Sequence, residues 1–128
     1  MATLIPTLLL LSFLLTSCAS TSGEDDGTVH HIVLCWLKEP ENEEARRAVI
    51  DGSKRLEDIP GVIHVEAGGP VPSDRAIVED SFDVGIVIVL RDRAALAAYA
   101  TNPMHLAILK EVLLPVTERY QVIDIEVE

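Results

Sequence analysis

Residues Phe82–Leu90, with the sequence FDVGIVIVL, decide the fold because they predict a β-strand with two apolar faces. Successive residues of a strand alternate between its two faces. The residues assigned to one face are Phe82, Val84, Ile86, Ile88 and Leu90, and those assigned to the other are Gly85, Val87 and Val89. The stretch Val29–Leu37 has the same two-sided pattern. Both faces of the predicted sheet therefore have to be covered.

Helices cover only one face of so small an open sheet, so the second face is expected to pack against another sheet. A symmetry-related copy of the chain is the simplest source of that sheet. At about 25 cal/mol per Å² of apolar surface, burying several such side chains is worth more than about 10 kcal/mol before the cost of association. The sequence therefore predicts a homodimer.

The other elements complete the order β-α-β-β-α-β. Apolar periodicity, helix caps and turn residues give their positions. The predicted elements are a strand Val29–Leu37, a helix at residues 42–57, a strand Val62–Ala67, a long loop that begins with residues 68–73, the strand Phe82–Leu90, a helix at residues 92–100, a second helix from Pro103, and a strand at residues 120–127. A turn at Ile59-Pro60-Gly61 follows the first helix. This order is that of the ferredoxin-like α+β fold.

A candidate site lies in the segment from Tyr99 to His105, with the sequence YATNPMH. Asn102 suits a helix N-cap and Pro103 the first helical position, which places His105 in the first turn. Helical spacing puts His105 on one face with aliphatic residues, namely Ile108, Leu109, Val112 and Val116. The imidazole is therefore expected to point inward, where burial and the helix dipole favour its neutral form.

A structural role for both side chains stays open at this point. A histidine on an apolar helical face is more often a hydrogen-bonded structural residue than a catalyst, and packing is the default role of Tyr99 at the end of an Ala-rich helix. Cys35 lies within an apolar strand, which predicts an inert buried thiol.

No metal site and no cofactor are predicted. His30 and His31 are neighbours on a strand, so their side chains point to opposite faces and cannot chelate one ion together. His64 lies on another predicted strand, and no His-x-x-x-His or acidic pair has ligand spacing.

The first 28 residues predict where the protein resides. The apolar core Leu4–Leu15 has about a dozen residues, which suits an export signal but not a bilayer crossing of roughly 20 residues. Leu15-Thr16-Ser17-Cys18 resembles the bacterial lipobox, in which lipid is attached to the cysteine that begins the mature protein. We expect a signal peptide at residues 1–17, a lipidated Cys18 and flexible tether at 18–28, and one domain at 29–128. A soluble secreted protein is the alternative.

The anchor on Cys18 would hold the protein in the bacterial cell envelope, at the outer membrane or the cell surface. The formal net charge is −11, and all ten basic and 21 acidic residues follow the predicted signal. This balance disfavours nucleic-acid binding and repels anionic membrane surfaces, so membrane association is expected only through the lipid on Cys18. Lipidation of Cys18 would leave Cys35 without a partner for a disulfide within the chain.

From His30 onward the chain resembles the stress-responsive A/B barrel family, called Dabb. The residues that carry the resemblance are, in order, His31-Ile32-Val33-Leu34, Ile59-Pro60-Gly61-Val62, Phe82-Asp83-Val84, Tyr99 with Pro103-Met104-His105, and Val122-Ile123-Asp124-Ile125-Glu126. The resemblance implies a dimeric α/β barrel in which the sheets of two copies face each other.

The resemblance also implies a chemistry. A plant polyketide cyclase of this family uses a tyrosine and a histidine at the separation of Tyr99 and His105 for an aldol ring closure. His105 would then be a general base that removes a proton α to a carbonyl, and Tyr99 would hold or protonate the oxyanion. His31 matches a further pocket histidine. The chain differs from that cyclase at Val84, where the cyclase has a histidine.

Two functions stay open from the sequence. One is an envelope-tethered, stress-associated module that binds a small apolar or carbonyl ligand. The other is a cofactor-free acid–base enzyme with His105 as base and Tyr99 as oxyanion donor. Related barrel families also bind haem or act as monooxygenases, and here His105 would be the axial-ligand candidate for this minor alternative.

Overall fold

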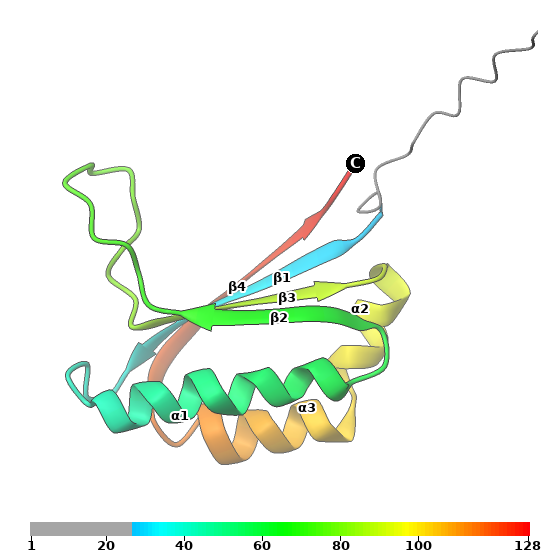
Figure 1. Ribbon diagram of the computed structural model, residues 1–128, viewed down its shortest axis with the longest axis horizontal. Helices are drawn as coiled ribbons and strands as arrows, with labels where there is room; N and C mark the ends of the chain where they lie inside the picture. The colour runs from blue at the N-terminus through cyan, green and yellow to red at the C-terminus, as the bar shows by residue number, and fades with distance from the viewer. Residues whose placement is uncertain (1–26) are drawn as a thin grey trace, which may run out of the picture.

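The computed structural model describes residues 27–128, which form an α+β domain with a four-stranded sheet (Figure 1). The elements in chain order are β1 (Val29–Leu37), α1 (Glu43–Lys54), the 3₁₀ turn η1 (Arg55–Asp58), β2 (Val62–Gly68), β3 (Val84–Leu90), α2 (Arg93–Ala100), α3 (Pro103–Ile108), the π-helical turn η2 (Leu109–Leu113) and β4 (Thr117–Glu126). The predicted β-α-β-β-α-β order is confirmed.

The sheet has the strand order β2-β3-β1-β4, and each neighbouring pair is antiparallel. This is the arrangement of the ferredoxin-like fold, in which β1 and β3 are the central strands. Figure 1 shows the helices on one side of the sheet, with α1 and α3 below it. Within residues 27–128, no helix lies against the opposite side of the sheet, which we call the open face.

The hydrophobic core lies between the helices and the covered face of the sheet. The strand residues buried there are Val29, Val33, Cys35 and Leu37 of β1, Val65 of β2, and Val84, Ile86, Ile88 and Leu90 of β3. The helical layer adds buried apolar residues, namely Val49, Leu56, Ala95, Tyr99, Ile108 and Leu113. Alternation along the strands leaves a second apolar set on the open face, which includes Ile32, Leu34, Val87, Ile123 and Ile125.

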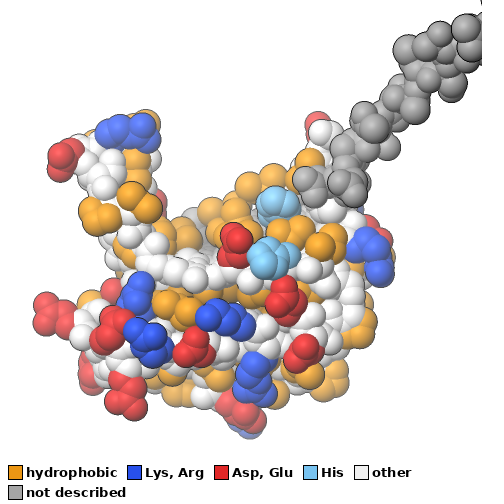
Figure 2. Space-filling view, viewed as in Figure 1, with side chains coloured by type: hydrophobic (Ala, Val, Ile, Leu, Met, Phe, Trp, Pro, Cys, Tyr) orange, Lys and Arg blue, Asp and Glu red, His pale blue; other side chains and the backbone are white. Residues whose placement is uncertain are grey.

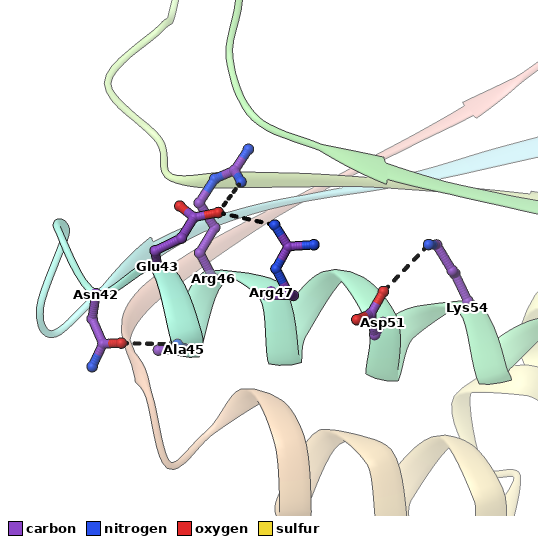
Figure 3. Close-up of polar contacts among 7 residues, drawn as sticks. All are labelled: Asn42, Glu43, Ala45, Arg46, Arg47, Asp51 and Lys54. Carbon is purple, nitrogen blue, oxygen red and sulfur yellow. Dashed lines mark hydrogen bonds and ion pairs between the residues drawn. The ribbon is translucent and has the colours of Figure 1, made fainter.

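Helix α1 begins where its sequence predicts, because the Asn42 side chain accepts a hydrogen bond of 2.9 Å from the backbone N–H of Ala45. The outer side of α1 carries ion pairs one turn apart, including Glu43 with Arg46 and Asp51 with Lys54 (Figure 3). Such exposed pairs add only a few tenths of a kcal/mol each, about 0.2–0.5, so α1 is held mainly by its apolar side.

Three element boundaries differ from the sequence prediction by more than one residue. The first helix changes to a 3₁₀ turn at Arg55, before Ile59 takes the extended conformation expected ahead of Pro60. Strand β4 begins at Thr117 rather than Tyr120, because the polar start of this strand pairs with the end of β1. Strand β3 begins at Val84 rather than Phe82.

The prediction that Phe82 shares a face with Val84 is wrong. A side-chain oxygen of Asp83 accepts a hydrogen bond of 2.7 Å from the Leu37 N–H, which ends the regular ladder ahead of Val84. The Phe82 ring lies on the open face, where Gly85 leaves it room, since a Cβ at Gly85 would come within 3.2 Å of the ring. Phe82 therefore adds to the apolar surface of the open face.

Residues 69–83 connect β2 to β3 and form a projecting segment that we call the arm. Figure 1 shows the arm rising from one end of the sheet on the side away from the helices. The predicted signal peptide and Cys18 lie outside the described residues. From residue 27 onward, none of the helices has the length and apolar character needed to cross a bilayer.

Candidate functional site

A pocket of about 210 Å³ lies between the helices and the covered face of the sheet. Most of its wall is aliphatic, and the aliphatic lining residues are Val33, Ile86, Ile88 and Val122 from the sheet and Leu56, Ile108, Leu109 and Leu113 from the helical layer. Polar groups reach it from His31 on β1, Tyr99 on α2, His105 on α3 and Tyr120 on β4. An apolar pocket with a few polar groups is the usual form of a small-molecule site.

The structure brings together the residues proposed from sequence. The ring centre of Tyr99 lies 5.5 Å from that of His31 and 4.3 Å from that of His105. These side chains come from different elements, and His31 and Tyr99 are far apart in the sequence. Folding therefore creates one polar cluster at the pocket wall.

His31 is held by Asp124 on the neighbouring strand. Its Nδ1 lies 2.6 Å from Oδ1 of Asp124, and the register pairs the two residues across β1 and β4. A carboxylate oxygen only accepts, so Nδ1 is the His31 nitrogen that carries a proton in this contact. The carboxylate thereby fixes the orientation of the ring, which turns Nε2 away from Asp124.

His105 is in the first turn of α3, as its sequence context predicts. The Asn102 side chain accepts a hydrogen bond of 2.8 Å from the Met104 N–H and caps the helix. The His105 Nδ1 lies 3.3 Å from the carbonyl oxygen of Ala100, so Nδ1 is the protonated nitrogen of the neutral ring. Burial, with a smaller contribution from nearby His31, lowers the pKa of His105 below its usual value of 6.5. The neutral imidazole expected from the sequence agrees with this direction.

Tyr99 is the most buried member of the cluster, with 2% of its surface exposed. Burial raises the pKa of its phenol well above the usual 10, so the hydroxyl stays protonated near neutral pH. A protonated phenol can donate a hydrogen bond to a carbonyl oxygen or an oxyanion. With the lone pair on the neutral imidazole of His105, the cluster offers a hydrogen-bond donor beside an acceptor.

The π-helical turn η2 changes which residues face the pocket. The sequence places Val112 on the face of His105, but a π turn inserts an extra residue, and Leu113 lines the pocket instead. Val112 packs against α1 at Gly52, where a Cβ would lie 2.6 Å from Val112 Cγ1. Glycine at position 52 therefore allows the close approach of η2 to α1.

The other chemically notable residues lie outside this cluster. His30 pairs with Val89 and faces the open side, so it is separated from His31 as the strand alternation predicts. His64 lies between Glu57 at 2.9 Å and Glu66 at 3.2 Å, and these carboxylates raise its pKa. Burial raises the pKa of the Cys35 thiol to about 11, which makes it unreactive.

Sequence reasoning missed Asp124 and Tyr120 as parts of the site. Both lie in β4, where alternation places them with Val122 on the side of the helices. An aspartate on one strand and a histidine on another could have suggested a hydrogen-bonded pair. Recognising that pair requires the register between β1 and β4, which the sequence does not show. Among the described residues, no group of three or more His, Cys, Asp or Glu side chains could hold a metal ion.

A model of the stress responsive A/B barrel domain, Dabb, matches residues 29–127. The chain belongs to the Dabb family. A Dabb protein of ferredoxin-like fold from Mesorhizobium loti is 27% identical, with a TM-score of 0.63, and the match covers 78% of this chain and 96% of that one. No curated protein matches the chain at a significant level.

More distant solved structures share the fold of this Dabb chain. The hydroxynitrile lyase of Passiflora edulis is 21% identical, with a TM-score of 0.66 over 81% of this chain and 95% of the lyase. A dimeric ferredoxin-like protein of unknown function from Thermobifida fusca is 19% identical, with a TM-score of 0.64 over 83% of this chain and 96% of that protein. These two likenesses support the ferredoxin-like fold.

Proposed function

We propose that the protein binds a small, mostly apolar compound that carries a carbonyl and a hydroxyl group. The observation that carries this proposal is the aliphatic pocket with His31, Tyr99 and His105 clustered at its wall. Aliphatic walls favour an apolar body, and the Tyr99 hydroxyl suits a carbonyl oxygen. The unprotonated nitrogen of the neutral His105 imidazole suits a hydroxyl donor.

Binding of two matched ketones tests this proposal. The full chain should bind 4-hydroxypropiophenone more tightly than propiophenone, because only the first can donate a hydrogen bond to an imidazole. His105→Leu should weaken binding of the hydroxylated ketone by about fivefold to tenfold, the worth of one hydrogen bond. His64→Gln, on an exposed histidine outside the pocket, is the control and should change nothing. NMR titration measures both affinities.

Equal affinity for the two ketones, or an unchanged affinity in His105→Leu, would contradict the proposed recognition.

Acid–base chemistry on a carbonyl compound is a second candidate function. The contact of 2.6 Å between His31 and Asp124 favours it, because a carboxylate on Nδ1 is a common way to orient a catalytic histidine. His105 is the base implied by the family resemblance, and the buried, protonated Tyr99 is suited to donate to an enolate oxygen. A hydroxynitrile lyase shares the fold, so the fold accommodates catalysis.

The same ketones distinguish an enzyme from a binding module when they are incubated in deuterium oxide. A base in the pocket would replace the hydrogens α to the carbonyl with deuterium. The variant that loses this exchange, His31→Gln or His105→Gln, would identify the imidazole that removes the proton. Exchange no faster than in buffer would leave binding as the function.

We further propose that the chain acts as a homodimer formed through the open face. The apolar open-face residues of β1, β3 and β4 support this proposal, because a monomer would leave them in water. The ferredoxin-like protein from Thermobifida fusca is dimeric, which supports a homodimer for this fold.

Envelope anchoring through lipid on Cys18 is also a proposal, supported by the apolar core Leu4–Leu15 and the lipobox-like residues 15–18. Mass spectrometry of the protein from its own host should give a mature chain that begins at Cys18 and carries the added mass of lipid. A mature chain without lipid, or one that begins elsewhere, would contradict the anchor.

A further inference from the structure

The arm at residues 69–83 is stiffened by its own sequence and hydrogen bonds. Pro70 and Pro72 fix the backbone near its start. The Ser73 N–H donates to the Asp80 side chain at 2.8 Å, which joins the outgoing and returning halves of the arm. Structureless connections of this length are uncommon in compact domains and usually serve a function.

The base of the arm is tied to β1, which sets the arm's direction. The Trp36 Nε1–H donates to Oγ of Ser81 at 3.0 Å, and the Asp83 side chain accepts from the Leu37 N–H. The Trp36 ring also contacts Phe82 edge-on, with ring centres 6.5 Å apart. The arm therefore leaves the sheet on the side of the open face (Figure 1).

Two large apolar side chains on the arm are left exposed by the rest of the described domain. Val71 is 83% exposed and Ile77 is 88% exposed, more than any other large apolar side chain among residues 27–128. Figure 2 shows apolar side chains exposed along the arm, with charged side chains at its tip. A stiff projection that exposes aliphatic groups is typical of a segment that packs on a partner.

The two edges of the sheet differ in charge and in exposed apolar surface, and this difference indicates which edge the arm contacts. The β2 edge carries His64 between Glu57 and Glu66, and charges of this kind protect an edge from pairing. The β4 edge is exposed from Glu118 to Glu126. Ile123 and Ile125 are its exposed large apolar side chains on the open face, and Tyr120 and Val122 are those on the side of the helices.

A face-to-face pair with its two-fold axis parallel to the strands places the β2 edge of one copy over the β4 edge of the other. The arm follows β2 and rises on the open face, so in this pair it reaches the partner copy beside β4. This arrangement covers Val71, Ile77 and the apolar β4 edge together. A second copy of this chain is therefore the partner that covers both arm side chains and the β4 edge.

We propose that the arm is a dimer clasp, in which Val71 and Ile77 of each copy pack against strand β4 of the other. This inference rests on the proposed homodimer and adds to it a defined contact outside the open face. The contact predicts that the arm contributes affinity that the two sheets alone do not supply.

The first test measures the dimer dissociation constant of the full chain by sedimentation equilibrium. Val71→Ser with Ile77→Ser should weaken the dimer at least tenfold, because each copy loses two buried aliphatic side chains. Asp74→Ser with Ala76→Ser, on exposed neighbours in the same arm, is the control and should change the constant less than twofold. Circular dichroism confirms that both variants fold.

The second test uses cysteines in a Cys18→Ser background, with buried Cys35 left in place. Chains carrying Ile77→Cys and chains carrying Gln121→Cys, mixed and oxidised, should form a disulfide-linked pair. Replacing Gln121→Cys with Ala48→Cys, on the solvent side of α1, should prevent that link.

The outcomes separate the clasp from the dimer beneath it. A wild-type protein that stays monomeric at micromolar concentration would overturn the homodimer and the clasp together. A dimer that the arm substitutions do not weaken, or a mixture with no Ile77–Gln121 link, would overturn the clasp alone.

Discussion

Replacing Ile32 with aspartate should convert the protein from a dimer to a monomer. Ile32 lies on the open face between Val87 of β3 and Ile123 of β4. A carboxylate buried there without a partner costs about 3 kcal/mol, and a two-fold interface contains the substitution twice. The sum of about 6 kcal/mol corresponds to a dissociation constant weaker by about four orders of magnitude.

Sedimentation equilibrium at micromolar concentration measures this change. Ala48→Asp, which adds the same charge on the exposed side of α1, should remain dimeric. Ile32 is half-buried in the single chain, so Ile32→Asp should still fold, and its far-ultraviolet circular dichroism should match that of the wild type. A dimeric Ile32→Asp would show that the open face is not the interface.

Replacing Tyr99 with alanine should give the largest loss of stability among the pocket variants. The side chain is almost fully buried against the core, and removal of a buried aromatic group costs about 3–5 kcal/mol. For a domain of this size, that loss lowers the melting temperature by about 15 °C or more. Calorimetry or thermal circular dichroism measures the change.

Tyr99→Phe separates the packing role of Tyr99 from its chemical role. The ring stays in place, so the free energy of unfolding should change by about 1 kcal/mol or less. The hydroxyl donor is lost, so ketone binding and any α-deuterium exchange should fall. Equal destabilisation by alanine and phenylalanine would mean that the hydroxyl supports the fold, and unchanged binding in Tyr99→Phe would remove Tyr99 from the site.

The positions of single elements show how far local patterns extend. The cap at Asn102 and the start of α3 follow from side chains that satisfy the first helical N–H groups, which involves only neighbours in sequence. The opposite orientations of His30 and His31 follow from strand alternation. Phe82 was misplaced because the Asp83 contact with Leu37 depends on a strand far away in the sequence.

The candidate site also contains some residues that local sequence predicts and others that only the tertiary structure identifies. Tyr99 and His105 could be proposed together because they share one short segment, and His31 was added through a resemblance. Asp124 could not be assigned, because its contact with His31 requires the register of β4 on β1. Leu113 lines the pocket where helical periodicity places Val112, because a π turn shifts the residues that face the pocket. Apolar periodicity in the sequence does not reveal a π turn.

Local patterns in the sequence are sufficient to predict the element order, the two-sided apolar strands and the helix start at Pro103, since each depends on alternation, helical periodicity or a local cap. Tertiary structure alone decided that Asp124 holds His31, that η2 turns Leu113 to the pocket, and that the arm stands on the open face. Those features depend on contacts between residues distant in sequence, and such contacts exist only after the sheet has set its register.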